Sequence, residues 1–260
     1  MSGNATVNYH AKSTEPQAFQ FDVDGIVGNI ISPELLPTDI HVRDVRHNLD
    51  AINFDNDGII FRHYQSQIQD FSDTSEWQDI YAAELDSILK EQIQAKDVMV
   101  FDHTVRIDDQ NAKRKPARNV HNDYSPRGAE QRLIKLVGKE RAKEYVNGHY
   151  GFVNIWRPIK HTIQTSPLGF IRPSSMKSDD WMDIELIYPD RQGQILGVAA
   201  NKNHDWFYLS EMTPDEITIF NIFDNQDRPH LAHSALDMHE KTHSKAPRMS
   251  IESRTLIRYS

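Results

Sequence analysis

The sequence of 260 residues contains no cysteine. The fold therefore has no disulfide, and the chain has no thiolate nucleophile and no cysteine-based zinc or iron–sulfur site. Any metal that the protein binds must be held by histidine, aspartate or glutamate. The sequence has 13 histidines and 38 acidic residues, so ligands of this kind are plentiful.

Long apolar runs and an excess of positive charge are missing as well. No stretch approaches the roughly 18 apolar residues of a membrane span, and the first 16 residues lack the basic and apolar regions of a signal peptide. We therefore expect a soluble, cytoplasmic protein without a membrane partner. The net charge of −9 repels phosphate backbones. We expect a small-molecule substrate and no nucleic acid, and we leave a homodimer open.

The chain is long enough for one sizeable core, and no internal repeat or linker divides it. We therefore predict a single domain over residues 1–260. Pro16, Pro33 and Pro37 punctuate its start, so residues 1–38 are expected to form a loosely ordered N-terminal extension, with the core beginning near Asp39.

Most of the remaining chain is strand-like. Two helices are predicted, one over residues 75–96 from helical spacing of apolar residues and one after Pro126. The other segments are short, turn-bounded and rich in branched and aromatic residues, at spacings too close for repeated crossover helices. They lie within residues 39–67 and begin again at Val98, Gly151, Met182, Asp205, Glu216 and Ser250. We predict an antiparallel barrel or sandwich with two flanking helices.

The tripeptide His121-Asn122-Asp123 is the first candidate for metal chemistry. Alternate residues at a strand end point to the same side, so an imidazole and a carboxylate can face one ion. A second histidine would complete the two-His-one-carboxylate face that holds Fe(II) and leaves positions open. On its own this His-x-Asp pattern is weak evidence for a metal site, because a surface histidine near an aspartate in a turn has the same sequence.

The third ligand is sought in the segment RPHLAHSALDMHEKTHSKAP, which contains four histidines. His233 is favoured because small and apolar residues flank it, as expected for a ligand inside a barrel wall. His230 is the second candidate, whereas His239 and His243 lie among Glu, Lys and Thr. The alternative is that all four are loop histidines without a metal.

The last strand places Arg248, Ser250, Glu252 and Arg254 at alternate positions. A buried arginine needs an anionic partner, and a dicarboxylate such as 2-oxoglutarate would offer one with bidentate geometry. Arg248 and Ser250 are the expected contacts of its distal carboxylate. Arg254 either contributes to the same ligand or pairs with Glu252 or another core acid.

Several ordered blocks of the sequence resemble the CmcJ/NvfI-type oxidoreductases, a branch of the non-haem iron, 2-oxoglutarate-dependent oxygenases. The resemblance extends from about Asp39 to Tyr259. One departure is Ala232–Leu236, which stands where the family has Pro-His-Thr-Ala-Phe. The blocks are Val120–Ser125, Asn154–Pro158, Ser166–Gly169, His204–Tyr208, Met212–Glu216 and Pro247–Arg254.

The resemblance implies a mainly β, double-stranded β-helix (a jelly-roll, cupin-like barrel) with flanking helices. It implies Fe(II) on His121, Asp123 and His233, and 2-oxoglutarate and molecular oxygen as co-substrates. Hydrogen abstraction from a natural product would give hydroxylation, desaturation, cyclisation or endoperoxidation.

Trp156 and Arg157 belong to the family pattern, and Arg157 is a candidate substrate contact, although the two point to opposite sides of a strand and only one can face inward. Tyr124, next to Asp123, is a second candidate that either hydrogen-bonds in the pocket or packs. Two other functions stay open at this point. One is a cupin-like metalloenzyme that does not use 2-oxoglutarate, and the other is a non-enzymatic jelly-roll binding module.

Overall fold

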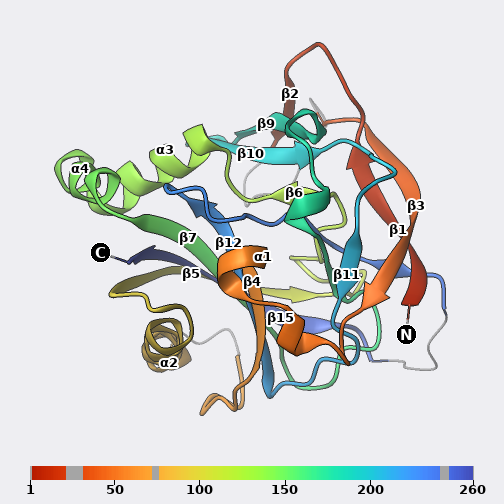
Figure 1. Ribbon diagram of the computed structural model, residues 1–260, viewed down its shortest axis with the longest axis horizontal. Helices are drawn as coiled ribbons and strands as arrows, with labels where there is room; N and C mark the ends of the chain where they lie inside the picture. The colour runs from red at the N-terminus through yellow and green to blue at the C-terminus, as the bar shows by residue number, and fades with distance from the viewer. Residues whose placement is uncertain (1, 22–31, 72–75, 241–245, 260) are drawn as a thin grey trace.

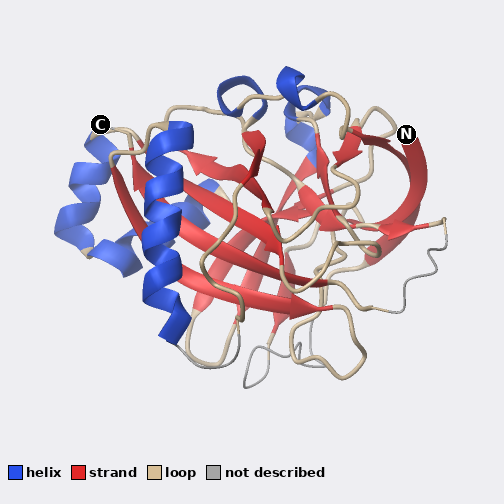
Figure 2. Ribbon diagram, turned by 90° about the horizontal axis from the view of Figure 1, so that it is seen from below, coloured by secondary structure: helices blue, strands red, loops and turns tan. Residues whose placement is uncertain are grey.

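The computed structural model describes residues 2–21, 32–71, 76–240 and 246–259. Two β-sheets lie face to face, with helices on the outside (Figures 1 and 2). The ten-stranded sheet has the order β14-β1-β3-β11-β8-β13-β6-β10-β9-β2, and the five-stranded sheet has the order β4-β12-β7-β15-β5. Neighbouring strands are antiparallel except for β3 with β11 and β2 with β9.

The strands of the larger sheet are β1 (Ser2–His10), β2 (Gln17–Gln20), β3 (Leu35–Asp44), β6 (His121–Asn122), β8 (Leu168–Ile171), β9 (Trp181–Ile187), β10 (Gln192–Val198), β11 (Trp206–Tyr208), β13 (His233–Ala235) and β14 (Asp237–Met238). Those of the smaller sheet are β4 (Ile59–His63), β5 (Asp97–Ile107), β7 (Tyr150–Pro158), β12 (Glu216–Asp224) and β15 (Met249–Arg258). The α-helices are α1 (Phe54–Asp57), α2 (Glu76–Ile93), α3 (Pro126–Val137) and α4 (Lys139–Asn147). Short 3-10 turns cover Leu49–Ala51, Pro173–Ser175 and Ser178–Asp180.

The main core lies between the two sheets. Phe152, Trp156 and Phe220 from the smaller sheet pack in one cluster with Phe170 and Phe207 from the larger sheet. Strand β7 is buried along its whole length, because its other face is covered by α2. This double burial explains why its sequence is apolar nearly throughout instead of alternating.

Helix α2 covers the outer face of the five-stranded sheet (Figure 2). The predicted helix is confirmed, and Leu85, Ile88, Leu89 and Ile93 are buried as its spacing suggests. Ile80 is the exception, since 51% of it is exposed. The buried face of the first turns is formed by two aromatic residues, Trp77 and Tyr81.

The structure corrects the expectation of a loosely ordered N-terminal extension, for the residues of 1–38 that it describes. Strand β1 pairs with β3 over its full length and with β14, and Ala5, Val7 and Tyr9 are buried. Strand β2 pairs with β9 at the edge of the same sheet. Apolar side chains at alternate positions of β1 are buried, and this burial stabilises the strand. The prediction failed because it gave more weight to the nearby prolines than to this alternation.

Helix α3 fixes the chain just after the His121–Asp123 segment. Ser125 caps the helix by accepting a hydrogen bond from the Gly128 N–H, and Pro126 occupies its first turn. A Cβ at Gly128 would collide with the carbonyl oxygen of Gln194, so glycine allows α3 to approach β10 closely.

No helix in the described part of the chain is both long and apolar enough to cross a membrane.

Candidate metal centre

His121, Asp123 and His233 meet between the two sheets. His121 begins β6 and His233 begins β13, and the two residues are direct partners across these antiparallel strands. Asp123 follows β6 immediately. One possible ligand atom from each of the three residues lies within 4.8 Å of the others, and His121 Nε2 is 3.4 Å from Asp123 Oδ1. The structure therefore brings together the three residues that the sequence analysis selected.

Backbone carbonyls fix the orientation of both imidazole rings. His121 Nδ1 lies 2.8 Å from the carbonyl oxygen of Asn119, and His233 Nδ1 lies 3.3 Å from that of Leu231. Because a carbonyl oxygen only accepts, each Nδ1 carries the proton and donates it. In the neutral form of each ring, Nε2 then carries the lone pair, which is the tautomer that a metal-binding histidine requires.

The two oxygens of Asp123 have different partners. Oδ2 accepts hydrogen bonds from Asn154 Nδ2 at 2.9 Å and from Arg254 Nε at 3.0 Å, while Oδ1 faces His121. Asn154 and Arg254 are themselves direct neighbours across β7 and β15. The smaller sheet thus holds one oxygen and leaves the other for an ion, as expected for a carboxylate ligand with an outer layer of hydrogen bonds.

Electrostatics keep these groups in the states that bind a cation. Burial alone would raise the pKa of Asp123, but Arg254 and the two histidines hold it well below its usual range. Burial, together with the nearby His121, lowers the pKa of His233 to about 3. At neutral pH the site therefore presents an ionised carboxylate and a neutral His233 imidazole.

Arg254 contacts three carboxylates and one hydroxyl. Beyond Asp123, its Nη1 lies 2.6 Å from Asp102 Oδ2 and 3.1 Å from Thr104 Oγ1, and its Nη2 forms an ion pair of 2.5 Å with Glu252. Burial alone would lower the pKa of Arg254, but these acids raise it well above its ordinary value. Of the two roles predicted for Arg254, the structure favours pairing with core acids over contact with a dicarboxylate, so we treat it as a positioning residue.

Arg248 lines a small cavity next to His121 and His233, and Ser250 lies beside Arg248. Arg248 is only 2% exposed, its Nε is 3.3 Å from Ser250 Oγ, and its guanidinium carbon lies 5.0 Å from the centre of the Trp156 ring. Burial, helped by Arg106, lowers its pKa to about 9. The cavity, of about 20 Å³, is lined by Arg106, Ala117, His121, Leu168, His233, Ala235, Arg248 and Glu252.

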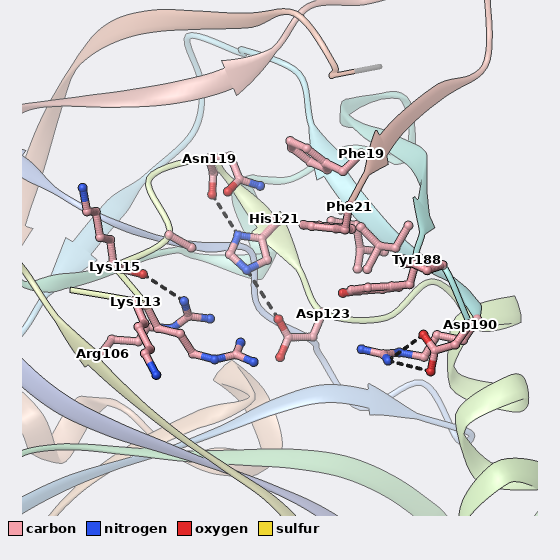
Figure 3. A pocket seen from close by; sticks show the side chains of 16 residues that line it. Phe19, Phe21, Arg106, Lys113, Lys115, Asn119, His121, Asp123, Tyr188 and Asp190 are labelled. Atoms are coloured by element: carbon pink, nitrogen blue, oxygen red, sulfur yellow. Dashed lines mark hydrogen bonds and ion pairs between the residues drawn. The ribbon is translucent and has the colours of Figure 1, made fainter. Parts of the chain in front are cut away.

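A much larger pocket, of about 900 Å³, opens at His121 and Asp123 and shares Arg106, Ala117 and His121 with the small cavity (Figure 3). Its walls differ in character, with basic side chains on one side and aromatic ones on the other. The wall residues, besides the two ligands, are Phe19, Phe21, Arg106, Lys113, Arg114, Lys115, Ala117, Asn119, Leu186, Tyr188, Pro189, Asp190, Arg191 and Ile195.

Comparison with known proteins agrees with this geometry. A family model described as "YDMC: Oxidoreductase/YMDC permease-like domain" matches residues 7–258. The chain belongs to this oxidoreductase family. It is similar to the alpha-ketoglutarate-dependent dioxygenase phiK of Fungal sp., with 27% identity over 97% of this chain and 95% of phiK. It is also similar to the hydroxylase/desaturase efuI of Hormonema carpetanum, with 27% identity over 83% of this chain and 82% of efuI.

The fold of this oxidoreductase has a close likeness among solved structures. A variant of the iron and alpha-ketoglutarate-dependent endoperoxidase NvfI superposes with a TM-score of 0.87 at 20% identity, covering 99% of this chain and 97% of that one. The mainly β jelly-roll fold and the family resemblance predicted from the sequence are thereby confirmed.

Arg157 of the oxidoreductase does not lie where the sequence analysis expected it. The prediction of a substrate contact is wrong in this structure, because Trp156 takes the inner face of β7 and Arg157 takes the outer face. Arg157 is only 3% exposed and donates to the carbonyl oxygens of Pro214 and Tyr64, away from the pockets around the ligands.

Tyr124 lies beside Asp123, as its position in the sequence requires. Its ring packs 4.9 Å from that of Phe152, and it borders a groove of about 360 Å³ that continues from the large pocket past Asp123 and Arg254. Burial raises the pKa of Tyr124 to about 12, so its hydroxyl remains protonated at neutral pH. A contact between Tyr124 and substrate stays a prediction.

The other histidines of the distal segment have different surroundings. His230 packs 5.1 Å from the ring of Trp181 in a separate cavity of about 730 Å³. His239 contacts Thr6 and Asp39. His243 lies outside the described residues. Among the candidates that are described, His233 alone joins His121 and Asp123.

Sequence reasoning missed several residues around the centre. Asn154 belongs to the family-like block Asn154–Pro158, but the sequence does not predict its hydrogen bond to Asp123. That contact depends on the register of β7 against β15. Arg106 ends a predicted strand without any local sign of function. Phe19 and Phe21 were assigned to the loose extension, although the alternation in Gln17-Ala-Phe-Gln-Phe21 is a strand signal that could have found them.

Proposed function

We propose that this oxidoreductase is an Fe(II)- and 2-oxoglutarate-dependent oxygenase that acts on a small natural-product molecule. The observation that carries the proposal is the donor set: two imidazole Nε2 atoms and one carboxylate oxygen, all on one side, with their other polar atoms already hydrogen-bonded. Two histidines and one carboxylate form the face that suits non-haem Fe(II). The printed names of phiK and efuI support the same reading.

Within this proposal His121, Asp123 and His233 hold the iron, and each has a distinct supporting contact. Bound iron, with oxygen and 2-oxoglutarate, supplies the oxidising power for hydroxylation, desaturation, cyclisation or endoperoxidation. The chain contributes orientation. The carbonyls of Asn119 and Leu231 hold the imidazoles in the ligand tautomer, and Asn154 and Arg254 keep Asp123 Oδ1 directed at the site.

Arg248 and Ser250 are proposed to bind the distal carboxylate of 2-oxoglutarate. A buried guanidinium with a lowered pKa is stabilised when an anion joins it. The cavity that contains Arg248 also borders His121 and His233, so a dicarboxylate bound to Arg248 would extend toward the metal ligands. The cavity measures only about 20 Å³, so the surrounding side chains must move to admit the whole molecule. The Ser250 hydroxyl lies 3.3 Å from Arg248 Nε and accepts a hydrogen bond from it.

The proposal is tested by anaerobic titration of the purified chain with Fe(II) and 2-oxoglutarate. We expect a visible charge-transfer band that saturates near one iron per chain and that is absent in a His121→Ala variant. Iron binding without the band would replace the proposal with a cupin-like metalloenzyme that does not use 2-oxoglutarate. Failure to bind iron would leave a non-enzymatic binding module.

Substitution of Arg248 by methionine is expected to weaken 2-oxoglutarate binding by roughly 30- to 150-fold, because hydrogen bonds to a charged group contribute roughly 2–3 kcal/mol. Methionine fills similar space without the charge. Iron affinity in the absence of 2-oxoglutarate should stay as in the wild type. The measurement is the band intensity against 2-oxoglutarate concentration at fixed Fe(II).

The matched control for this variant is Arg141→Met, which removes an exposed arginine of α4. It should bind 2-oxoglutarate like the wild type. An Arg248→Met protein with unchanged 2-oxoglutarate affinity would contradict the assignment of this cavity to the co-substrate.

We further propose that residues 1–260 act as one oxygenase domain, that the enzyme works in the cytoplasm, and that its substrate is a small molecule instead of a nucleic acid. The net charge of −9 supports the last point. A homodimer stays a prediction, which sedimentation of the purified chain would test.

A further inference from the structure

The large pocket next to His121 and Asp123 is basic, in contrast to the chain as a whole. Its lining has five cationic side chains, from Arg106, Lys113, Arg114, Lys115 and Arg191. The two acidic residues in the described part of its lining both have other partners, since Asp123 belongs to the metal centre and Asp190 pairs with Arg191 at 3.2 Å. A chain with a net charge of −9 thus concentrates positive charge at the mouth of its candidate active site.

Three of these cations have no acidic partner among the described residues. In the described ranges, no carboxylate lies within 4.0 Å of the side-chain nitrogens of Lys113, Arg114 or Lys115, and all three residues are exposed. By contrast, Arg43, Arg46, Arg118 and Arg172 on the same protein form ion pairs.

Two hydrogen bonds to backbone carbonyls of this basic segment hold it against the pocket. The Arg106 side chain donates from Nη1 to the carbonyl oxygen of Lys115 at 2.9 Å, and the Ile107 N–H donates to that of Arg114 at 3.0 Å. Figure 3 shows Lys113 and Lys115 on the same side of His121 as Arg106. The position of the segment is therefore fixed by main-chain contacts, which side-chain substitutions leave in place.

The opposite wall is aromatic. Phe21 stacks on Tyr188 with ring centres 4.5 Å apart and an angle of 10° between the planes, and the Arg191 guanidinium lies 3.9 Å from the Tyr188 ring centre. Phe19 adds a third ring to this side (Figure 3). Stacked rings offer an ordered apolar surface, which suits a flat or cyclic apolar body.

We propose that the substrate is an organic acid with an apolar, ring-bearing body. The body packs on Phe19, Phe21 and Tyr188, and the ionised acid group binds Lys113, Arg114 and Lys115 on the other side of the metal ligands. This inference deepens the proposed function and rests on it for the reaction. The large pocket and the cavity assigned to 2-oxoglutarate adjoin, since Arg106, Ala117 and His121 line both. The acid site is distinct from that cavity, because Lys113, Arg114 and Lys115 do not line it and Arg248 does not line the large pocket.

The test compares an aromatic acid with its neutral amide, using equilibrium dialysis of 2-naphthoate and 2-naphthamide against the metal-free chain. We expect the acid to bind at least about tenfold more tightly, since charge-assisted hydrogen bonds of about 1.4 kcal/mol give that ratio. The triple variant Lys113→Gln, Arg114→Gln, Lys115→Gln should bind the acid as weakly as the amide, with amide binding unchanged. Added salt should weaken only acid binding in the wild type.

The matched control is the triple variant Lys139→Gln, Arg141→Gln, Lys202→Gln, which removes the same charge from exposed positions outside the pocket. It should bind 2-naphthoate like the wild type, and an equal loss there would overturn the proposal by showing an effect of net charge alone. Equal binding of acid and amide to the wild type would also overturn it. In a further dialysis, saturating concentrations of 2-oxoglutarate and Mn(II) together should leave 2-naphthoate binding unchanged. Competition between 2-oxoglutarate and 2-naphthoate would show that the probe binds in the Arg248 cavity and would overturn the assignment. The comparisons of acid with amide and of the variants use metal-free protein, so their outcomes are independent of the iron titration.

Discussion

An Asp123→Ala variant is expected to lose iron binding and oxygenase activity. The substitution removes the only carboxylate of the three ligands and leaves two imidazoles, which cannot hold Fe(II) on a three-point face. The loss should exceed the roughly 10- to 100-fold decrease that follows removal of an outer hydrogen-bonding partner of a metal ligand. Iron per chain after anaerobic reconstitution, and succinate formation, are the two measurements.

The matched control is Asp102→Ala. Asp102 contacts the same guanidinium as Asp123, with Oδ2 2.6 Å from Arg254 NH1, but it does not face the histidines. This variant should retain one iron per chain, with affinity reduced by about tenfold at most. Normal iron loading of Asp123→Ala would show that Asp123 is not a metal ligand. Equal losses of iron in the two variants would show that the acids around Arg254 matter in general and that position 123 has no special role.

An Arg254→Met variant is expected to destabilise the metal-free protein by about 3–5 kcal/mol, because it leaves buried acids without their cation. The acids concerned are Asp123, Glu252 and the less buried Asp102. Iron affinity should also fall by roughly 10- to 100-fold, since Asp123 loses a partner that orients it. Urea unfolding at neutral pH and Fe(II) titration measure the two effects.

The pH dependence separates this electrostatic role from simple packing. The folded pKa of Asp123 is lowered, so the stability that its ion pair contributes is present above the unfolded value of about 3.9 and is lost as pH falls below it. The difference in unfolding free energy between wild type and Arg254→Met should therefore shrink below about pH 4. Arg43→Met, which breaks an exposed pair with Asp205, should cost no more than about 1 kcal/mol at neutral pH. If the loss of unfolding free energy in Arg254→Met were independent of pH, the ion-pair explanation would be contradicted.

The metal ligands could be predicted from the sequence because their signals are local. His121 and Asp123 are two residues apart, and His233 has small, apolar neighbours that fit a buried strand. The contacts that support them are not local. Asn154 and Arg254 reach the same oxygen of Asp123 only because β7 and β15 pair in one particular register, which no short segment encodes.

The fold could be predicted as far as local patterns reach. Most central strands and the helix α2 follow from residue type and spacing, whereas β1 and β2 were missed because nearby prolines obscured their alternation. Arg157 shows a different limit. Period-two alternation separates Trp156 from Arg157 but does not say which is inside, and β7 is covered on both faces.

Strand β15 holds both ends of the proposed co-substrate site. Arg248 precedes its first residue, and Arg254, which orients the metal ligand Asp123, lies six residues further on, at roughly 3.3 Å per residue. Since β15 is hydrogen-bonded to β5 on one side and β7 on the other, this span can neither stretch nor shorten. If Arg248 binds the distal carboxylate as proposed, selection among diacids of different chain length would be a property of this rigid strand and not of a loop.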